Sequence, residues 1–185
     1  MDQSVIAALA RWPEVPAVFG WLALTARGEW RLRGDPIGNS AIREFIGRNY
    51  ADDERGRWFF QNGPQRVFVE LETTPIIYRS TAAGTVVAHT GITPARCSGV
   101  ALIDGAALLL VTDLGAGMID DRDAATVIET ISTAGGVALE PWLTGGCEAQ
   151  FVPSRLGMAG APLTIERMTS ADLPATFGYT RNPQP

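Results

Sequence analysis

The chain has 185 residues, 46% of them hydrophobic, a formal charge of −5 and a pI near 4.9. This composition predicts a folded protein with a sizeable core, and the acidic balance argues against a nucleic-acid partner, because nucleic-acid binding depends on clustered cations that neutralise phosphates. All fifteen basic residues are arginine, which excludes Schiff bases on lysine and the lysine of a P-loop.

The chain offers few residues that suit a metal or a cofactor. His89 is the single histidine, and Cys97 and Cys147 lie fifty positions apart, which fits neither a zinc cage nor a paired-imidazole site. We therefore expect no metal and no cofactor, and we expect both cysteines to be reduced. Asp2 stands where a secretory signal would be basic, and no apolar run approaches the roughly 20 residues that cross a bilayer. The chain is predicted to be cytoplasmic, without membrane contact.

The first predicted elements are a short helix and a hairpin. Residues 5–9 carry apolar side chains at helical spacing, so we expect a short N-terminal helix. Residues 17–26 and 29–33 then read as two strands around an Arg-Gly turn, with Trp30 and Leu32 facing inward.

A second helix and a second hairpin follow. Asn39 or Ser40 can cap this helix, which we expect to end near Asn49. Residues 58–61 and 66–72 alternate as two strands around a tight turn that contains Asn-Gly. The expected apolar stripe of the helix consists of Ile42, Phe45 and Ile46.

The same order of elements returns after residue 98. Residues 100–103 and 106–112 predict a hairpin, a helix follows from Asp120 or Asp121, and 148–152 with 163–168 predict a strand pair. Gly135-Gly136 would end this helix. Its apolar side recurs at helical spacing through Ala124, Val127, Ile128 and Ile131.

This repetition predicts an α+β fold built from two similar hairpin-helix-hairpin units with mostly antiparallel sheets. The expected units span residues 1–92 and 93–185 and pack as one globule, with strands at 76–80 and 85–90 bridging them. The alternative is a single irregular α+β domain. The tail after Thr180 is expected to be frayed.

Two passages resemble a proteobacterial family of small α+β proteins classed only as a domain of unknown function. They read GEWRLRGDPIGNSAIREFI and RGRWFFQNGPQRVFVELETTPIIYR, and they lie in the first half of the chain. The resemblance implies a compact protein with repeated motifs and a role as a signalling or ligand-sensing module. It supplies no catalytic residue.

The turn of the second hairpin is the main candidate site, because polar side chains that could bind a small anionic or amide-bearing ligand crowd around it. In the alternative interpretation the Asn-Gly pair only satisfies the turn, the glutamines are solvated, and Arg66 pairs with Glu70 or Glu72. If the site is functional, alanine at Gln61 and Arg66 should leave the thermal midpoint nearly unchanged. The candidate ligand-binding residues are Trp58, Gln61, Asn62, Gln65, Arg66 and Tyr78.

Two other patterns have both a functional and a structural interpretation. Residues 113–117 resemble a dinucleotide-binding turn, but Asp120 replaces the third glycine and its charge would repel a pyrophosphate. Asp120, Asp121 and Asp123 could hold a hard cation, yet the first turn of a predicted helix favours a capping role for them.

No nucleophile, metal or phosphate motif is present, so the sequence favours a non-enzymatic regulatory module that binds a small molecule or a protein partner. One alternative is a small hydrolase or isomerase that uses Glu70 or Glu72 for acid–base catalysis beside Arg66. Another is an oligomeric scaffold, in which apolar strand edges pair two chains as a homo-oligomer.

Overall fold

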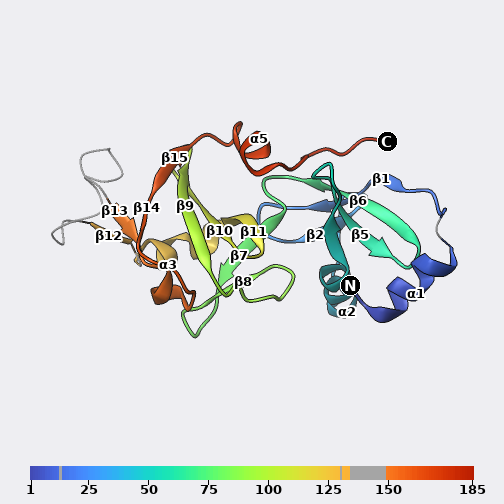
Figure 1. Ribbon diagram of the computed structural model, residues 1–185, viewed down its shortest axis with the longest axis horizontal. Coiled ribbons are helices and arrows are strands. Elements are labelled where there is room, and N and C mark those ends of the chain that lie inside the picture. The colour runs from blue at the N-terminus through green and yellow to red at the C-terminus, as the bar shows by residue number, and fades with distance from the viewer. Residues whose placement is uncertain (13, 130, 134–148) are drawn as a thin grey trace. The chain divides into compact units, whose positions relative to one another are not determined.

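The computed structural model describes residues 1–12, 14–129, 131–133 and 149–185 (Figure 1). The chain divides into two compact units. Unit 1 comprises Met1–Pro75, His89–Gly91 and Pro174–Pro185, and unit 2 comprises Ile76–Ala88 and Ile92–Leu173. The sequence placed one boundary at residue 92, whereas this division begins unit 2 at Ile76 and assigns the C-terminal segment to unit 1.

Unit 1 holds a six-stranded sheet in the order β3-β2-β1-β6-β5-β4, in which β1 and β6 are parallel and the other neighbours are antiparallel. The predicted cap of α2 is confirmed, because the Asn39 side chain accepts a hydrogen bond from the amide of Ile42. The elements are α1 (Gln3–Arg11), β1 (Val18–Leu24), β2 (Trp30–Leu32), β3 (Asp35–Pro36), α2 (Ser40–Arg48), β4 (Tyr50–Asp52), β5 (Trp58–Asn62), β6 (Gln65–Leu71) and α5 (Leu173–Phe177), whose first residue belongs to unit 2.

Unit 2 holds a six-stranded sheet in the order β15-β9-β10-β11-β7-β8 and a three-stranded sheet in the order β12-β13-β14. Its elements are β7 (Ile76–Ser80), β8 (Val86–Ala88), β9 (Cys97–Ile103), β10 (Ala107–Thr112), β11 (Gly115–Ile119), the 3₁₀ helix η1 (Asp121–Asp123), α3 (Ala124–Ile128), β12 (Ile131–Thr133), β13 (Ala149–Phe151), the 3₁₀ helix η2 (Pro153–Leu156), β14 (Leu163–Thr164) and β15 (Glu166–Met168). The α+β class is therefore confirmed.

The two six-stranded sheets share one connectivity. In each sheet the first strand of an early antiparallel group, β1 or β7, runs parallel to the last strand of a later group, β6 or β11. The residue after that last strand donates its amide to the first strand in both units, Glu72 to the carbonyl of Leu24 and Asp120 to that of Tyr78. In this comparison β7 and β8 of unit 2 correspond to β1 and β2 of unit 1. The sequence instead predicted that the hairpin at residues 100–112 corresponds to β1 and β2.

The predicted hairpin-helix-hairpin repeat itself is not confirmed. Helix α2 separates the two strand groups of unit 1, while residues 89–96 between β8 and β9 contain no helix. The helix expected to run to Ile131 is also wrong, because α3 ends at Ile128 and Ile131 pairs with Phe151 in a sheet. The glycine pair expected to end that helix lies outside the described residues.

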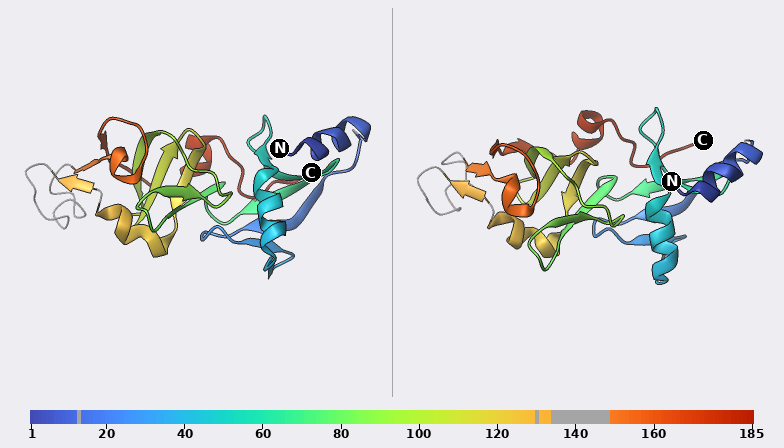
Figure 2. Two further views of the ribbon diagram at one scale, coloured as in Figure 1. Left: turned by 90° about the horizontal axis from the view of Figure 1, so that it is seen from below. Right: turned by 60° about the horizontal axis from the view of Figure 1, so that its bottom comes forward.

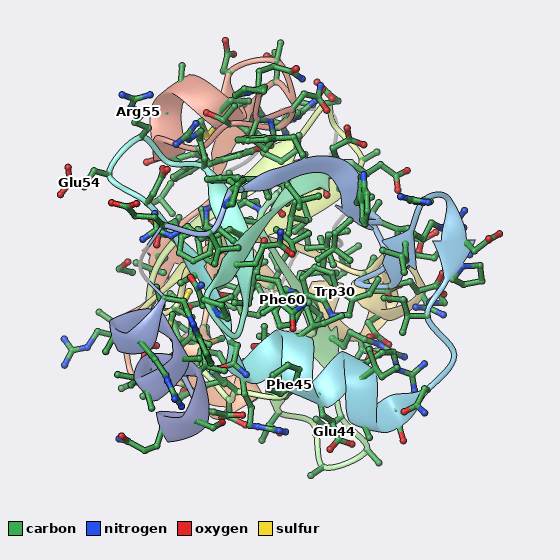
Figure 3. All side chains as sticks on the ribbon, turned by 90° about the vertical axis from the view of Figure 1, so that its right-hand side faces the viewer. Trp30, Glu44, Phe45, Glu54, Arg55 and Phe60 are labelled. Carbon is green, nitrogen blue, oxygen red and sulfur yellow. The ribbon has the colours of Figure 1, made fainter. Side chains whose placement is uncertain are left out.

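The sheet of unit 1 curls strongly. Four strand spacings, roughly 19 Å in a flat sheet, separate β2 from β4. Yet the rings of Trp30 on β2 and Tyr50 on β4 lie 5.1 Å apart between centroids. Helix α2 packs into the concave side, where Phe45 meets Phe60 edge to face at 5.5 Å (Figure 3). The opposite side of this sheet, called the convex face below, carries the alternate residues of each strand.

Two predicted core positions are wrong. Leu32 is opposite Leu22 in the sheet but lies near its open edge, and it is 48% exposed. Ile42 lies in the first turn of α2 and is 49% exposed, so the buried side of this helix begins later, at Phe45 and Ile46.

The C-terminal tail is ordered against unit 1, which corrects the expectation of a frayed end. The amide of Leu71 donates to the carbonyl of Arg181, and the amide of Thr180 donates to that of Gly56. The hydroxyl of Tyr179 donates to the carbonyl of Thr73, and Pro183 is buried. The tail, red in Figure 2, therefore lies alongside the strands of unit 1.

No helix in the described part of the chain is long and apolar enough to span a membrane.

Candidate binding face of unit 1

The β5–β6 hairpin has the predicted form. Gln61 is opposite Arg66 and Asn62 is opposite Gln65, which leaves a two-residue turn at Gly63 and Pro64. Gly63 has a φ of +58°, a conformation that favours glycine, so the Asn-Gly signal in the sequence marked this turn correctly.

The two glutamines near the turn serve structural roles. Gln61 is fully buried, its Nε2 donates to the carbonyl of Gly63, and its backbone amide donates to the carbonyl of Asn49. Gln65 donates from Nε2 to the carbonyl of Pro16. The interpretation in which both glutamines are merely solvated therefore fails for Gln61.

Neither of the two aromatic residues proposed as a ligand wall shares a sheet face of unit 1 with Gln61. Trp58 packs against Tyr50 at 4.8 Å on the concave side of the sheet. Gln61 is three residues further along β5, so its side chain points to the opposite, convex face. Tyr78 belongs to unit 2, where its hydroxyl lies 2.7 Å from that of Thr112 and donates to the carbonyl of Gly115. Burial raises the pKa of Tyr78 to about 12, so it stays protonated.

Arg66 and Asn62 are the exposed members of the candidate set. The Arg66 guanidinium stacks on the ring of Phe59, with Cζ 4.6 Å from the ring centroid. The expected pairing of Arg66 with Glu70 or Glu72 does not occur, and no ion pair to Arg66 is found among the described residues. Its five N–H donors are therefore available to an external acceptor.

A second exposed arginine has the same environment. The guanidinium of Arg33 lies over the indole of Trp21, with Cζ 3.8 Å from the ring centroid, and Trp21 is 47% exposed. The Arg33 side chain likewise has no acidic partner within the described part of the chain. This pair was not predicted from the sequence, where its only local signal is an arginine at a turn position that usually holds asparagine or glycine.

Both stacked arginines belong to the convex face. Trp21 alternates with the buried Leu22, which places it on the convex side of β1. Phe59 is opposite Phe68 in the β5–β6 ladder, and Phe19 stacks on Phe68 at 4.5 Å. We call this cluster the arginine–aromatic face, and it consists of Phe19, Trp21, Arg33, Phe59, Arg66 and Phe68.

Other arginines of the chain are neutralised by neighbours. In unit 1, Arg57 pairs with Asp53 at 2.8 Å, and Arg48 pairs with Asp2 at 3.3 Å. In unit 2, Asp120 has no exposed side-chain surface and receives contacts from Arg79 and Arg122. Hydrogen bonds from Arg122 lower the pKa of Asp120 to about 2. Arg57 also lies over a ring, that of Phe68, with Cζ 4.5 Å from the centroid. It therefore has both a ring and a carboxylate as neighbours, whereas Arg33 and Arg66 have a ring and no carboxylate of the described residues.

The acidic residues near Asp120 and the glycine-rich residues 113–117 have structural roles. Asp120 caps η1 by accepting from the amide of Arg122, as the capping interpretation predicted. Residues 113–117 form the β10–β11 hairpin, in which Thr112 is opposite Gly115, so no strand-to-helix turn exists there. Across the described residues no cluster of His, Cys, Asp or Glu suits a metal ion.

His89 and Cys97 belong to different units. The His89 ring lies in unit 1, 5.2 Å from Trp30 and 5.6 Å from Tyr50, and burial lowers its pKa to about 3. Cys97 is a free, buried thiol of unit 2 whose pKa is raised by burial. Cys147 lies outside the described residues.

Residues 1–184 match the model of the family DUF2944, described as "Protein of unknown function (DUF2946)". The chain belongs to this family. The prediction of a domain-of-unknown-function family is therefore confirmed, while its repeated motifs are not. No curated protein matches the chain.

Two solved structures are similar to the chain, both of DUF1285 family proteins. The one from Silicibacter pomeroyi DSS-3 has a TM-score of 0.52 and 14% identity, and the match covers 90% of this chain and 96% of that one. The one from Shewanella baltica OS155 has a TM-score of 0.45 and 14% identity over 58% of this chain and 90% of that one. At this identity the likeness to the Silicibacter protein concerns the fold alone.

Proposed function

We propose that this family member is a non-enzymatic binding module, and that the arginine–aromatic face of unit 1 is its recognition surface. One observation carries the proposal: Arg33 and Arg66 present exposed guanidinium groups, each held on an aromatic ring and neither paired with an acid of the described chain. Arginine and tryptophan are also the residues that most often dominate binding energy in interfaces.

Stacking prepares these side chains for binding. A guanidinium that already lies flat on a ring loses less rotamer freedom when it binds an acceptor, and its edge donors remain free to form paired hydrogen bonds. An exposed cation–π contact is worth about 0.5–1 kcal/mol, too little to explain the arrangement as a major source of stability. The geometry therefore favours recognition of an acceptor-rich ligand or protein partner.

The hydrolase or isomerase alternative has less support. Glu72 accepts a hydrogen bond from the amide of Ala26 at 2.8 Å, which engages one carboxylate oxygen in holding a turn. Glu70 lies on the convex side of β6 beside Ala23, without a contact to Arg66. The scaffold alternative would place a second copy of the chain on the same face, as a homo-oligomer.

Native mass spectrometry of the purified protein tests the proposal. The wild type should carry a ligand or partner that is lost in Arg66→Gln, because this change removes the charge and keeps the length of the side chain. Arg43→Gln is the matched control, since Arg43 is an exposed arginine of α2, away from this face. A wild type that carries nothing, or an adduct that survives Arg66→Gln, would contradict the proposal. A dimer lost in Arg66→Gln would support the scaffold form.

A further inference from the structure

Arg33 occupies an unfavourable backbone conformation. It has a φ of +51° in the two-residue turn between β2 and β3, where Leu32 is opposite Asp35. A non-glycine residue in the left-handed region costs about 1 kcal/mol or more, and asparagine or glycine would fill this position at less cost. Strained residues gather at functional sites, so this conformation needs a reason beyond the turn.

The strained turn aims the Arg33 side chain at Trp21. Its amide donates to the carbonyl of Trp21 at 2.7 Å, which fixes the turn against β1, and the guanidinium then covers the indole at 3.8 Å. A nearby arginine stabilises the same turn, since Nη1 of Arg31 donates to the carbonyl of Gly34. The conformation that is costly for the backbone thus presents a fixed cation on an exposed aromatic ring.

The second stacked arginine lies at a distance that an extended chain can span. Two strand spacings separate Arg33 on the β2–β3 turn from Arg66 on β6, and the register offsets them by two residues, roughly 7 Å, along the strands. Their backbone positions are therefore about 12 Å apart. In an extended peptide, side chains four residues apart lie on the same side and about 13 Å from each other.

We infer that the arginine–aromatic face binds an extended acidic segment of a partner protein, with carboxylates four residues apart on Arg33 and Arg66. This inference rests on the proposed function and specifies its partner. Charge complementarity at the two guanidinium groups supports this occupant, because neither is paired with an acid of the described chain. Glu70, half-buried on the same side of β6, has the charge of the peptide and disfavours a carboxylate directly beside it. Trp21 supplies apolar contact between the two charges.

Fluorescence anisotropy with labelled synthetic peptides tests the inference. The probe is a peptide with glutamate at every fourth position, compared with the same peptide carrying glutamine and with one carrying adjacent glutamates. The full chain should bind the first peptide best, and binding should weaken as salt rises. Arg33→Gln and Arg66→Gln should each weaken binding about fivefold, as expected for an exposed charge pair, and Arg43→Gln should not.

Several results would overturn the inference. They are absent binding of the glutamate peptides, equal binding of the glutamine peptide, equal affinity in Arg33→Gln, or binding of inorganic polyphosphate in place of the peptides. In each case the proposed function would stand if native mass spectrometry still showed an adduct that depends on Arg66. If the adduct and the peptide binding are both absent, the proposed function and this inference fail together.

Discussion

Replacing Gly56 with alanine should destabilise unit 1 more than an ordinary change of this kind. Gly56 is buried with a φ of +69°, and a Cβ at this position would collide with the carbonyl oxygen of Gly178 and lie 2.9 Å from its carbonyl carbon. Backbone atoms cannot rotate away as a flexible side chain can. The C-terminal tail would have to move away from the β4–β5 connection, and the amides of Thr180 and Leu71 would lose their acceptors.

The size of the effect follows from two contributions. Alanine at positive φ costs about 1 kcal/mol, and two lost backbone hydrogen bonds add about 0.5–1.5 kcal/mol each, so the free energy of unfolding should fall by about 2–4 kcal/mol. Gly34→Ala is the matched control in the same unit. Gly34 has a φ of +91°, and a Cβ there meets no heavy atom of the described chain within 4 Å, so it should cost only the backbone contribution.

Urea unfolding followed by tryptophan fluorescence measures both variants, and proteolysis of the C-terminal tail gives a second readout. Gly56→Ala should unfold at lower urea than Gly34→Ala and should release the tail to protease in native buffer. Equal midpoints for the two variants, with an intact tail in both, would refute the reasoning that the tail is a packed part of unit 1.

Three further predictions concern single side chains. Gln61→Ala should lower the free energy of unfolding by about 2 kcal/mol because it empties a buried site, whereas Arg66→Ala should change it by less than about 1 kcal/mol; equal urea midpoints would contradict this. Tyr78→Phe should cost about 1–3 kcal/mol in calorimetry, more than Tyr50→Phe, because the Tyr78 hydroxyl contacts Thr112 and Gly115 while the Tyr50 hydroxyl donates to the carbonyl of Pro75. The folded-state pKa of Asp120 is lowered from 3.8 to about 2, so its contribution to the free energy of unfolding is present above pH 4 and is lost as pH falls toward 2. Because Arg122 is 44% exposed, we expect this contribution to be about 1 kcal/mol. Asp120→Asn should remove this pH dependence from acid unfolding curves.

Local patterns in the sequence predicted local structure well. Alternation of apolar and polar residues predicted most of the strands. Residue types predicted the Asn39 cap and the turn at Gly63, and the α+β class followed from these elements. These features depend on neighbours within a few residues, which is the range over which periodicity and turn chemistry act. The helix through Ile131 failed because pairing with Phe151, twenty residues away, outweighed its local periodicity.

The candidate site depended on contacts that a single sequence does not encode locally. The parallel pairing of β1 with β6 joins strands more than forty residues apart, and it brings Trp21 and Arg33 onto the same face as Phe59 and Arg66. The sequence therefore identified Arg66 through its turn and missed Arg33, whose significance appears only once the two strands are adjacent. Gln61 was identified for its polarity, but burial gives it a structural role.

Nuclear magnetic resonance of the arginine side chains tests the central claim most directly. During titration with the peptide that carries glutamate at every fourth position, the Nε–H resonances of Arg33 and Arg66 and the indole N–H of Trp21 should shift together, with one affinity. The resonance of Arg48, which lies in α2 and already pairs with Asp2, should stay in place. Shifts confined to other arginines, or none in Arg33 and Arg66 at saturation, would contradict recognition through the arginine–aromatic face.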